Sequence, residues 1–229
     1  MAKRMSLALA FGLAAALWAG PASAGCDDTA KAGIDWSGCS KNHLILRGSN
    51  LISAQLAGTD LSTTDLMESN LSKAQLVGAS LSRSRLKQAN LAGANLEKAT
   101  AYRADFRGAD LTGASLVKAE LDRADLTDAK LAGADLSKAS LGRSQLVHAD
   151  LKGAKLVKTY LARANLSGAN LADSDLTNAY FLFTRIEGAD LSGASGVTQD
   201  QLEDTCGDAK TKLPAGLKPS PDWPCPPSE

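Results

Sequence analysis

The sequence predicts an all-β solenoid, in which the chain winds into stacked coils around one hydrophobic core. An apolar residue, leucine in most cases, recurs every five residues without a slip from Leu46 to Leu191, and a small residue stands two places before nearly every one of them. A step of five rotates a residue by about 140° on a helix and moves it to the opposite face of a flat strand. The chain must therefore bend once per repeat, so that both kinds of residue point inward and neighbouring coils pair through their backbones.

The core column is nearly uniform. Leucine occupies its thirty positions except at Ala101, Phe106, Phe181 and Ile186. A core alanine leaves a void of several methyl groups, and the next core position is Phe106. We interpret the Phe106 ring as filling the gap beside Ala101.

The repeats Ala109-Asp110-Leu111, Ala134-Asp135-Leu136 and Ala169-Asn170-Leu171 resemble those of the pentapeptide-repeat family. The resemblance covers about two thirds of the chain. It implies a right-handed quadrilateral β-helix in which four pentapeptides make one coil. We assign residues 46–195 to this solenoid.

A second period of twenty residues on the outer positions agrees with a coil of four repeats. Arginine and lysine each form a column two places after the core residue, on adjoining sides. Ladders of cations spaced by about 4.8 Å could bind several phosphates or carboxylates at once. The alternative is that these cations are solvated and neutralised by Asp105, Glu120, Asp122 and Asp125. We name these columns the basic ridge, a candidate anion-binding site made of Arg83, Arg103, Arg123, Arg143, Arg163, Lys98, Lys118, Lys138 and Lys158.

A second candidate surface is aromatic. Tyr160 and Tyr180 fall one coil apart, and Phe183 lies close to them in a chain with few aromatic residues. This cluster is a candidate patch for a partner or for self-association. The alternative is that the C-terminal helix and tail fold over it.

The first 24 residues read as a secretory signal peptide. Lys3 and Arg4 precede an apolar run that is too short to cross a membrane comfortably, and Ala22-Ser23-Ala24 forms a cleavage site. We expect a periplasmic or secreted protein that is not transmembrane. The alternative is a lipoprotein anchored at Cys26. Without residues 1–24 the chain is close to neutral, so no strong global field recruits nucleic acid.

The four cysteines lie near the two ends of the chain. In an oxidising compartment we expect Cys26 to pair with Cys39 and Cys206 with Cys225, each pair stapling one end. We expect residues 25–45 to cap the first coil, with Trp36 lying over it.

Residues 196–229 form the expected C-terminal cap. Thr198 and Gln201 predict a capping box that opens a short helix, which a tail containing proline follows. The segments Cys206-Gly207-Asp208 and Thr211-Lys212-Leu213-Pro214 resemble the ending of exported bacterial members of the family.

No catalytic motif stands out. The sequence has no phosphate loop, no nucleophile elbow, no zinc-protease motif and only two histidines. We predict no enzyme, no cofactor and no metal site, and we interpret the acids before core residues as side chains that are bonded to the backbone or solvated. We predict an exported scaffold or binding module of the cell envelope that binds an unknown protein or an anionic polymer. The family resemblance implies one alternative function, a DNA-mimicking gyrase inhibitor, and a secreted effector is the other. A homodimer is a candidate assembly.

Overall fold

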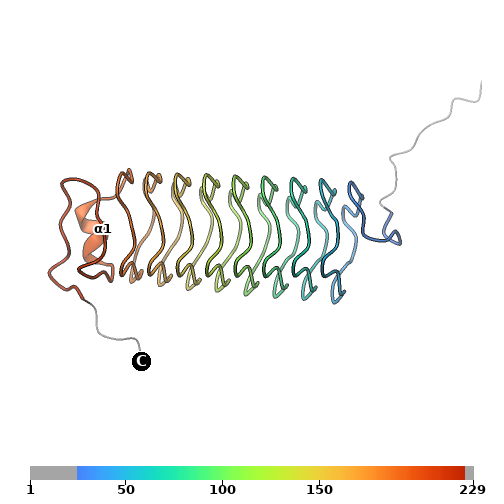
Figure 1. Ribbon diagram of the computed structural model, residues 1–229, viewed down its shortest axis with the longest axis horizontal. Helices are drawn as coiled ribbons and strands as arrows, with labels where there is room; N and C mark the ends of the chain where they lie inside the picture. Colours follow the sequence, from blue (N-terminus) through green and yellow to red (C-terminus); the bar gives the residue numbers. More distant parts are fainter. Residues whose placement is uncertain (1–24, 225–229) are drawn as a thin grey trace, which may run out of the picture.

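The protein is a rod of stacked coils (Figure 1). This computed structural model describes residues 25–224, and the ends of that segment lie at opposite ends of the rod. Parallel β-bridges link each residue before a core position to the residue twenty places later, from Asp35 with Gln55 to Asp175 with Ser195. Since core positions recur every five residues, each coil has four sides.

Leucine side chains fill the interior. Every core leucine from Leu51 to Leu191 is at most 1% exposed, and Phe106 and Ala101 are equally buried. Burying each leucine contributes about 1.5 to 3 kcal/mol relative to leaving it in water. The small residues two places earlier, from Ala54 to Ala189, are also buried, which lets the backbone close in at each corner.

Each corner is a β-turn that begins at a core residue. In one such turn the Ala54 N–H donates to the Leu51 carbonyl at 3.1 Å, and Ser53 has a φ of 54°. This hydrogen bond, with a positive φ at the third residue of the turn, is the pattern of a type II turn. Glycine is the residue that best tolerates this third position.

The backbone N–H groups of a repeat are all used. Leu91 and Gly93 donate to the next coil at 2.6 and 2.9 Å, Asn90 donates to the preceding coil at 2.9 Å, and the fourth N–H closes the turn. The fifth belongs to Ala92, which donates to the Asn90 side chain at 3.0 Å. The same bond recurs along the rod, where the N–H two residues after an Asp or Asn donates to its side-chain oxygen. The interpretation of these residues as bonded to the backbone is therefore confirmed.

The β-structure consists of isolated bridges. Within residues 25–224 the structure contains no extended strand, because each bridge involves one residue per side of a coil. A corner every five residues leaves room for only one residue in the pairing geometry. The predicted β-helix is therefore built without the strands that the term suggests.

The solenoid begins before the predicted boundary at residue 46. Asp35 already pairs with Gln55, and Ser40 pairs with Asp60. Trp36 fills a core position of this first coil and is 1% exposed, so it lies within the coil rather than over it. Most of the predicted cap at residues 25–45 is therefore coil, which the leucine pattern misses because the first core residues are not leucines.

The cap proper is the short segment before this coil. It is held by the disulfide between Cys26 and Cys39, whose Cα atoms are 5.6 Å apart. Lys41 occupies a core position, and its amine lies 4.1 Å from the centre of the Trp36 ring and donates to the Cys26 carbonyl. A cation over an aromatic ring thus replaces leucine packing at this end.

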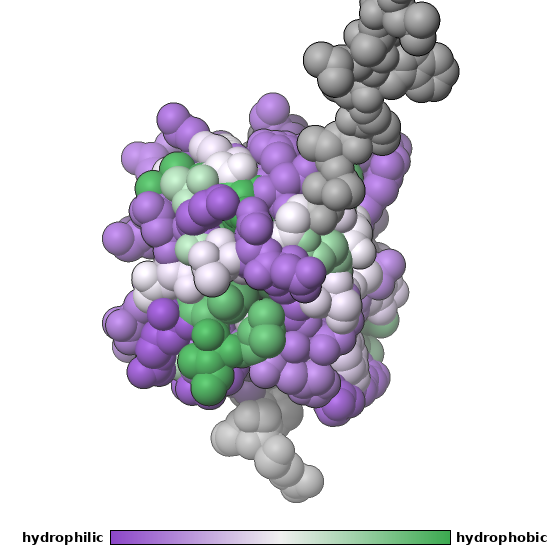
Figure 2. All heavy atoms as spheres, turned by 90° about the vertical axis from the view of Figure 1, so that its right-hand side faces the viewer, coloured by the Kyte–Doolittle hydropathy of each residue, from purple (hydrophilic) through white to green (hydrophobic). Residues whose placement is uncertain are grey.

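Part of the N-terminal edge stays open. Among the described residues, no backbone hydrogen bond reaches the N–H or carbonyl groups of Ile45 and Asn50. Leu44 and Ile45 are 39% and 84% exposed beside this edge. Figure 2 views this end of the rod and shows hydrophobic surface on it.

The C-terminal end is covered. Helix α1, Gln199–Glu203, begins with a reciprocal capping box between Thr198 and Gln201 and lies at the end of the rod (Figure 1). The tail then pairs with the last coil through bridges between Arg185 and Cys206 and between Asp190 and Lys212.

Some predictions fall outside the described residues. These are the signal peptide at 1–24 and Cys225, the expected partner of Cys206. Cys206 itself is disulfide-bonded. Over residues 25–224 the structure has no helix that is long and apolar enough to cross a membrane.

Candidate functional site

The basic ridge flanks one side of the solenoid. Its nine residues are all exposed, and each is the third residue of a corner turn with a φ between 55° and 62°. The lysine corners and the arginine corners border the same side, which runs in one coil from Lys158 to Arg163. We call this side the basic face.

The arginines of the ridge are not neutralised by neighbouring acids. Among the ion pairs of residues 25–224, only one involves the ridge, between Lys98 and Glu97 at 3.5 Å. Arg103 instead lies over the Tyr102 ring at 5.2 Å, and Arg163 lies over Phe183 at 5.6 Å. The guanidinium groups are therefore available to a ligand.

Most of the acids expected to neutralise the ridge have other partners. Asp105 and Asp125 lie on the adjoining side and pair with Arg107 at 2.6 and 3.7 Å. The hydrogen bonds from Arg107 hold the pKa of Asp105 below its ordinary value. Asp122 accepts hydrogen bonds from Ser140 at 2.8 Å and from the Gly142 N–H at 3.1 Å.

Tyr160 and Tyr180 form an exposed stack on the basic face. Their ring centres are 5.3 Å apart and their planes differ by 14°. The two residues are 46% and 47% exposed, and Phe183 is 55% exposed. The described part of the tail does not fold over this patch, contrary to the alternative raised from the sequence.

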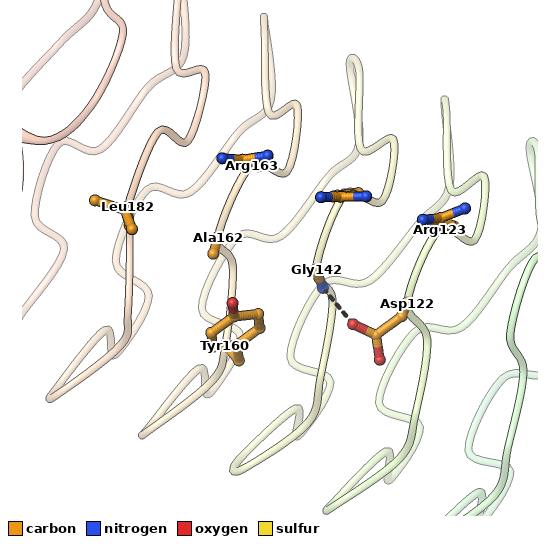
Figure 3. Close-up of a pocket in the computed structure, with 8 residues that line it drawn as sticks. Asp122, Arg123, Gly142, Tyr160, Ala162, Arg163 and Leu182 are labelled. Carbon is orange, nitrogen blue, oxygen red and sulfur yellow. Dashed lines mark hydrogen bonds between the residues drawn. The ribbon is translucent and has the colours of Figure 1, made fainter.

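A shallow groove lies between the aromatic stack and the arginine corners (Figure 3). Its floor is Gly142 and Ala162, which are buried although residues at this point of the repeat otherwise carry side chains into solvent. Figure 3 shows Arg123 and Arg163 along one rim and Tyr160 below the floor residues. The groove is lined by Asp122, Arg123, Gly142, Arg143, Tyr160, Ala162, Arg163 and Leu182.

Gly142 is needed for its lack of a side chain. A Cβ atom there would lie 2.7 Å from the Asp122 carboxylate and 3.0 Å from the Tyr160 ring. The glycines at the coil corners have a positive φ, whereas Gly142 does not. Its role is therefore to let Asp122 and Tyr160 converge over it.

The ridge and the tyrosines can be identified from the sequence, whereas the groove was not predicted. The signal is the outer column after the core residue, which reads Tyr102, Asp122, Gly142, Ala162 and Leu182 at intervals of twenty. Two small residues between larger ones predict a depression at that point. Within residues 25–224 no cluster of three metal-binding side chains occurs.

A family model described as pentapeptide repeats matches the chain over residues 45–83, 79–116, 119–156 and 154–193. These segments cover most of the solenoid. No curated protein sequence matches the chain significantly.

Solved structures with similarity to the chain are also repeat proteins. HetL, involved in heterocyst differentiation regulation in the cyanobacterium Nostoc sp. strain PCC 7120, is 33% identical over 76% of this chain and 90% of its own, with a TM-score of 0.38. A pentapeptide repeat protein of the Arabidopsis thaliana thylakoid lumen is 28% identical over 57% of this chain and 79% of its own, with a TM-score of 0.41. QnrB1, a plasmid-mediated fluoroquinolone resistance protein, is 16% identical over 78% of this chain and 89% of its own, with a TM-score of 0.41.

Proposed function

Because this chain belongs to the pentapeptide-repeat family, we propose that it acts as a non-catalytic binding module, and that the basic face is its binding surface for an anionic ligand of the cell envelope. The observation that carries this proposal is the arginine column, which none of the ion pairs in residues 25–224 neutralises. Five guanidinium groups stand one per coil, at a spacing of about 4.8 Å.

The corner geometry presents the ridge side chains to solvent. A side chain at a positive φ costs about 1 to 2 kcal/mol relative to the right-handed region, a cost that glycine avoids. Glycine occupies such corners in another column, at Gly93, Gly113, Gly133 and Gly153. Other polar residues also occupy such corners, for example Ser53, Gln88 and Asp128, so the ridge is distinguished by its unbroken columns of cations.

The test is retention on immobilised heparin. Replacing Arg103, Arg123 and Arg143 together with glutamine should lower the salt concentration that elutes the protein. Each lost cation reduces the number of counterions that binding releases from the polyanion. The matched control replaces Lys73, Lys130 and Lys152, which are exposed on the opposite side. Equal elution of the two triple variants would refute a dedicated binding face.

Export is the second part of the proposal. We expect mature protein in the periplasm or the medium, starting at Gly25, with cysteines that react with an alkylating reagent only after reduction. The Cys26–Cys39 disulfide supports this placement, because a cysteine in a disulfide cannot also carry a thioether-linked lipid.

Cell fractionation followed by intact mass spectrometry tests the export. Lipid on Cys26 would make the protein a tethered rod. A cytoplasmic chain with free thiols would overturn export and return attention to DNA mimicry.

A further inference from the structure

We propose that the groove on the basic face binds an acidic polysaccharide, with the sugar chain lying along the rod axis. This inference rests on the proposed function, because it names the class of anion that the basic face takes. Three chemically different groups border the groove, and each selects for one property of such a ligand.

The arginine rim selects for repeated negative charge. Arg123, Arg143 and Arg163 line the groove from three successive coils, about 4.8 Å apart. This spacing is close to the length of one extended sugar unit. Each guanidinium can take one carboxylate or sulfate through two parallel hydrogen bonds.

Asp122 selects against a ligand that carries only negative charge. Its carboxylate points toward Gly142 at the groove floor, where it accepts the Gly142 N–H and the Ser140 hydroxyl (Figure 3). A carboxylate has about four acceptor sites, so it can also accept ligand hydroxyl groups. Because it repels phosphate or carboxylate chains, Asp122 favours a ligand that has hydroxyl donors as well as anions.

Tyr160 supplies an apolar surface for a sugar ring. The Tyr180 ring stacks against the Tyr160 ring, with their centres 5.3 Å apart, and restricts its orientation. Tyr160 is still 46% exposed. Tyrosine offers a rigid, partly apolar surface at low entropic cost. The C–H groups on one face of a pyranose ring can pack against such a surface, whereas a flexible acidic peptide gains less from it.

The shape of the groove favours a polymer. It runs over four coils, from Asp122 to Leu182, and is open rather than enclosed. Small ligands are usually held in cavities that bury most of their surface. A long chain can instead bind side-on, with several units contacting successive coils.

The first measurement is affinity electrophoresis of the full mature protein in gels that contain one polymer at a time. Polygalacturonate, hyaluronan and chondroitin sulfate are the acidic polysaccharides, dextran is the neutral one, and polyglutamate and polyphosphate carry charge without sugar rings. We expect at least one acidic polysaccharide to retard the protein. The concentration of polymer charge needed for this should be lower than the concentration at which polyglutamate or polyphosphate retards it equally.

Two variants of one column test the position of the site. Arg143→Gln should weaken polysaccharide binding by about tenfold or more, as expected for a lost charge-assisted hydrogen bond. Arg83→Gln is the matched control, because it removes the same charge from the same column but outside the groove. Both residues occupy the same turn position, with a φ of 58° at Arg83 and 57° at Arg143. Because Arg83 belongs to the basic face but not to the groove, Arg83→Gln should weaken binding by about threefold or less, clearly less than Arg143→Gln does.

Two further positions test ligand chemistry. Tyr160→Ala should weaken binding by about tenfold, and Tyr160→Phe should retain it. Asp122→Asn keeps an oxygen for the Gly142 N–H but removes the charge, so binding of polyglutamate should rise relative to the polysaccharide. Unchanged melting temperatures would show that each variant is folded.

The outcomes separate this inference from the proposed function. Equal loss in Arg83→Gln and Arg143→Gln, with no effect of Tyr160→Ala, would overturn the groove and leave a general basic face. Polyglutamate bound as tightly as every acidic polysaccharide would also overturn it. No binding of any polyanion by the wild-type protein would overturn both proposals.

Discussion

The packing of Phe106 against the gap at Ala101 can be tested quantitatively. Both residues are fully buried core residues on adjoining sides. Phe106→Ala should cost about 3 to 5 kcal/mol, since it removes a buried ring beside a position that is already small. For a chain of this size each kcal/mol lowers the melting temperature by about 2 to 4 °C, so the loss should be about 6 to 20 °C.

A double-mutant cycle makes the test specific. Ala101→Leu alone should overpack the core and cost about 1 to 3 kcal/mol. Phe106→Leu alone should leave a small void, and the two changes together should recover most of the loss because the core column becomes uniform. Denaturant unfolding measures all four proteins. A coupling energy within about 0.5 kcal/mol of zero would refute the packing, because residues without contact add independently.

Three further predictions concern the ends of the rod. Replacing Cys26 and Cys39 with serine should cost about 3 kcal/mol, as expected for a loop of this length (separation 13), and a melting temperature that dithiothreitol does not change would contradict it. The hydrogen bond from Lys212 contributes most to lowering the pKa of Asp190, to about 2, so the contribution of Asp190 to stability should be complete above about pH 4 and lost as the pH falls to 2. Carboxyl titration by NMR measures this, and Lys212→Met should raise the pKa of Asp190 toward its ordinary value. Thr198→Ala should cost about 1 kcal/mol by removing the helix cap, and hydrogen exchange in α1 that stays unchanged would argue against this role.

The coil could be predicted from sequence because its signals are local and periodic. The step of five places Leu51, Leu56 and their successors inside, and the period of twenty in the arginine column agrees with a coil of four sides. The absence of extended strands was not predicted. It follows from the turn that Ser53 and its equivalents form after every core residue.

The start of the solenoid was misplaced for a physical reason. Trp36 and Lys41 fill core positions that leucine fills elsewhere, because they pack against the cap and each other. A spacing of five was still present in Gly33 and Gly38, which have the positive φ of corner residues. Glycine spacing would therefore have located the first coil where the hydrophobic pattern did not.

One part of the candidate site, the arginine column, could be predicted from the sequence, and the groove could not. Columns of arginine can be read directly, since they depend only on the period. The groove depends on how Asp122 and Tyr160 converge over Gly142, and that convergence is a matter of side-chain direction. Asp122 and Tyr160 are 38 positions apart in the sequence, and they converge because their coils lie on either side of the coil that holds Gly142.

The two ends of the rod differ in what they can join. A contact between two open N-terminal edges at Ile45 and Asn50 would use the same surface on both copies, so it closes after two molecules. A filament would need the open edge of one copy to meet unpaired backbone at the other end, where the tail already pairs with Arg185 and Asp190. Association through the open N-terminal edges would thus double the length of the rod, and with it the length of the basic face, while the paired tail disfavours continuation into a fibre.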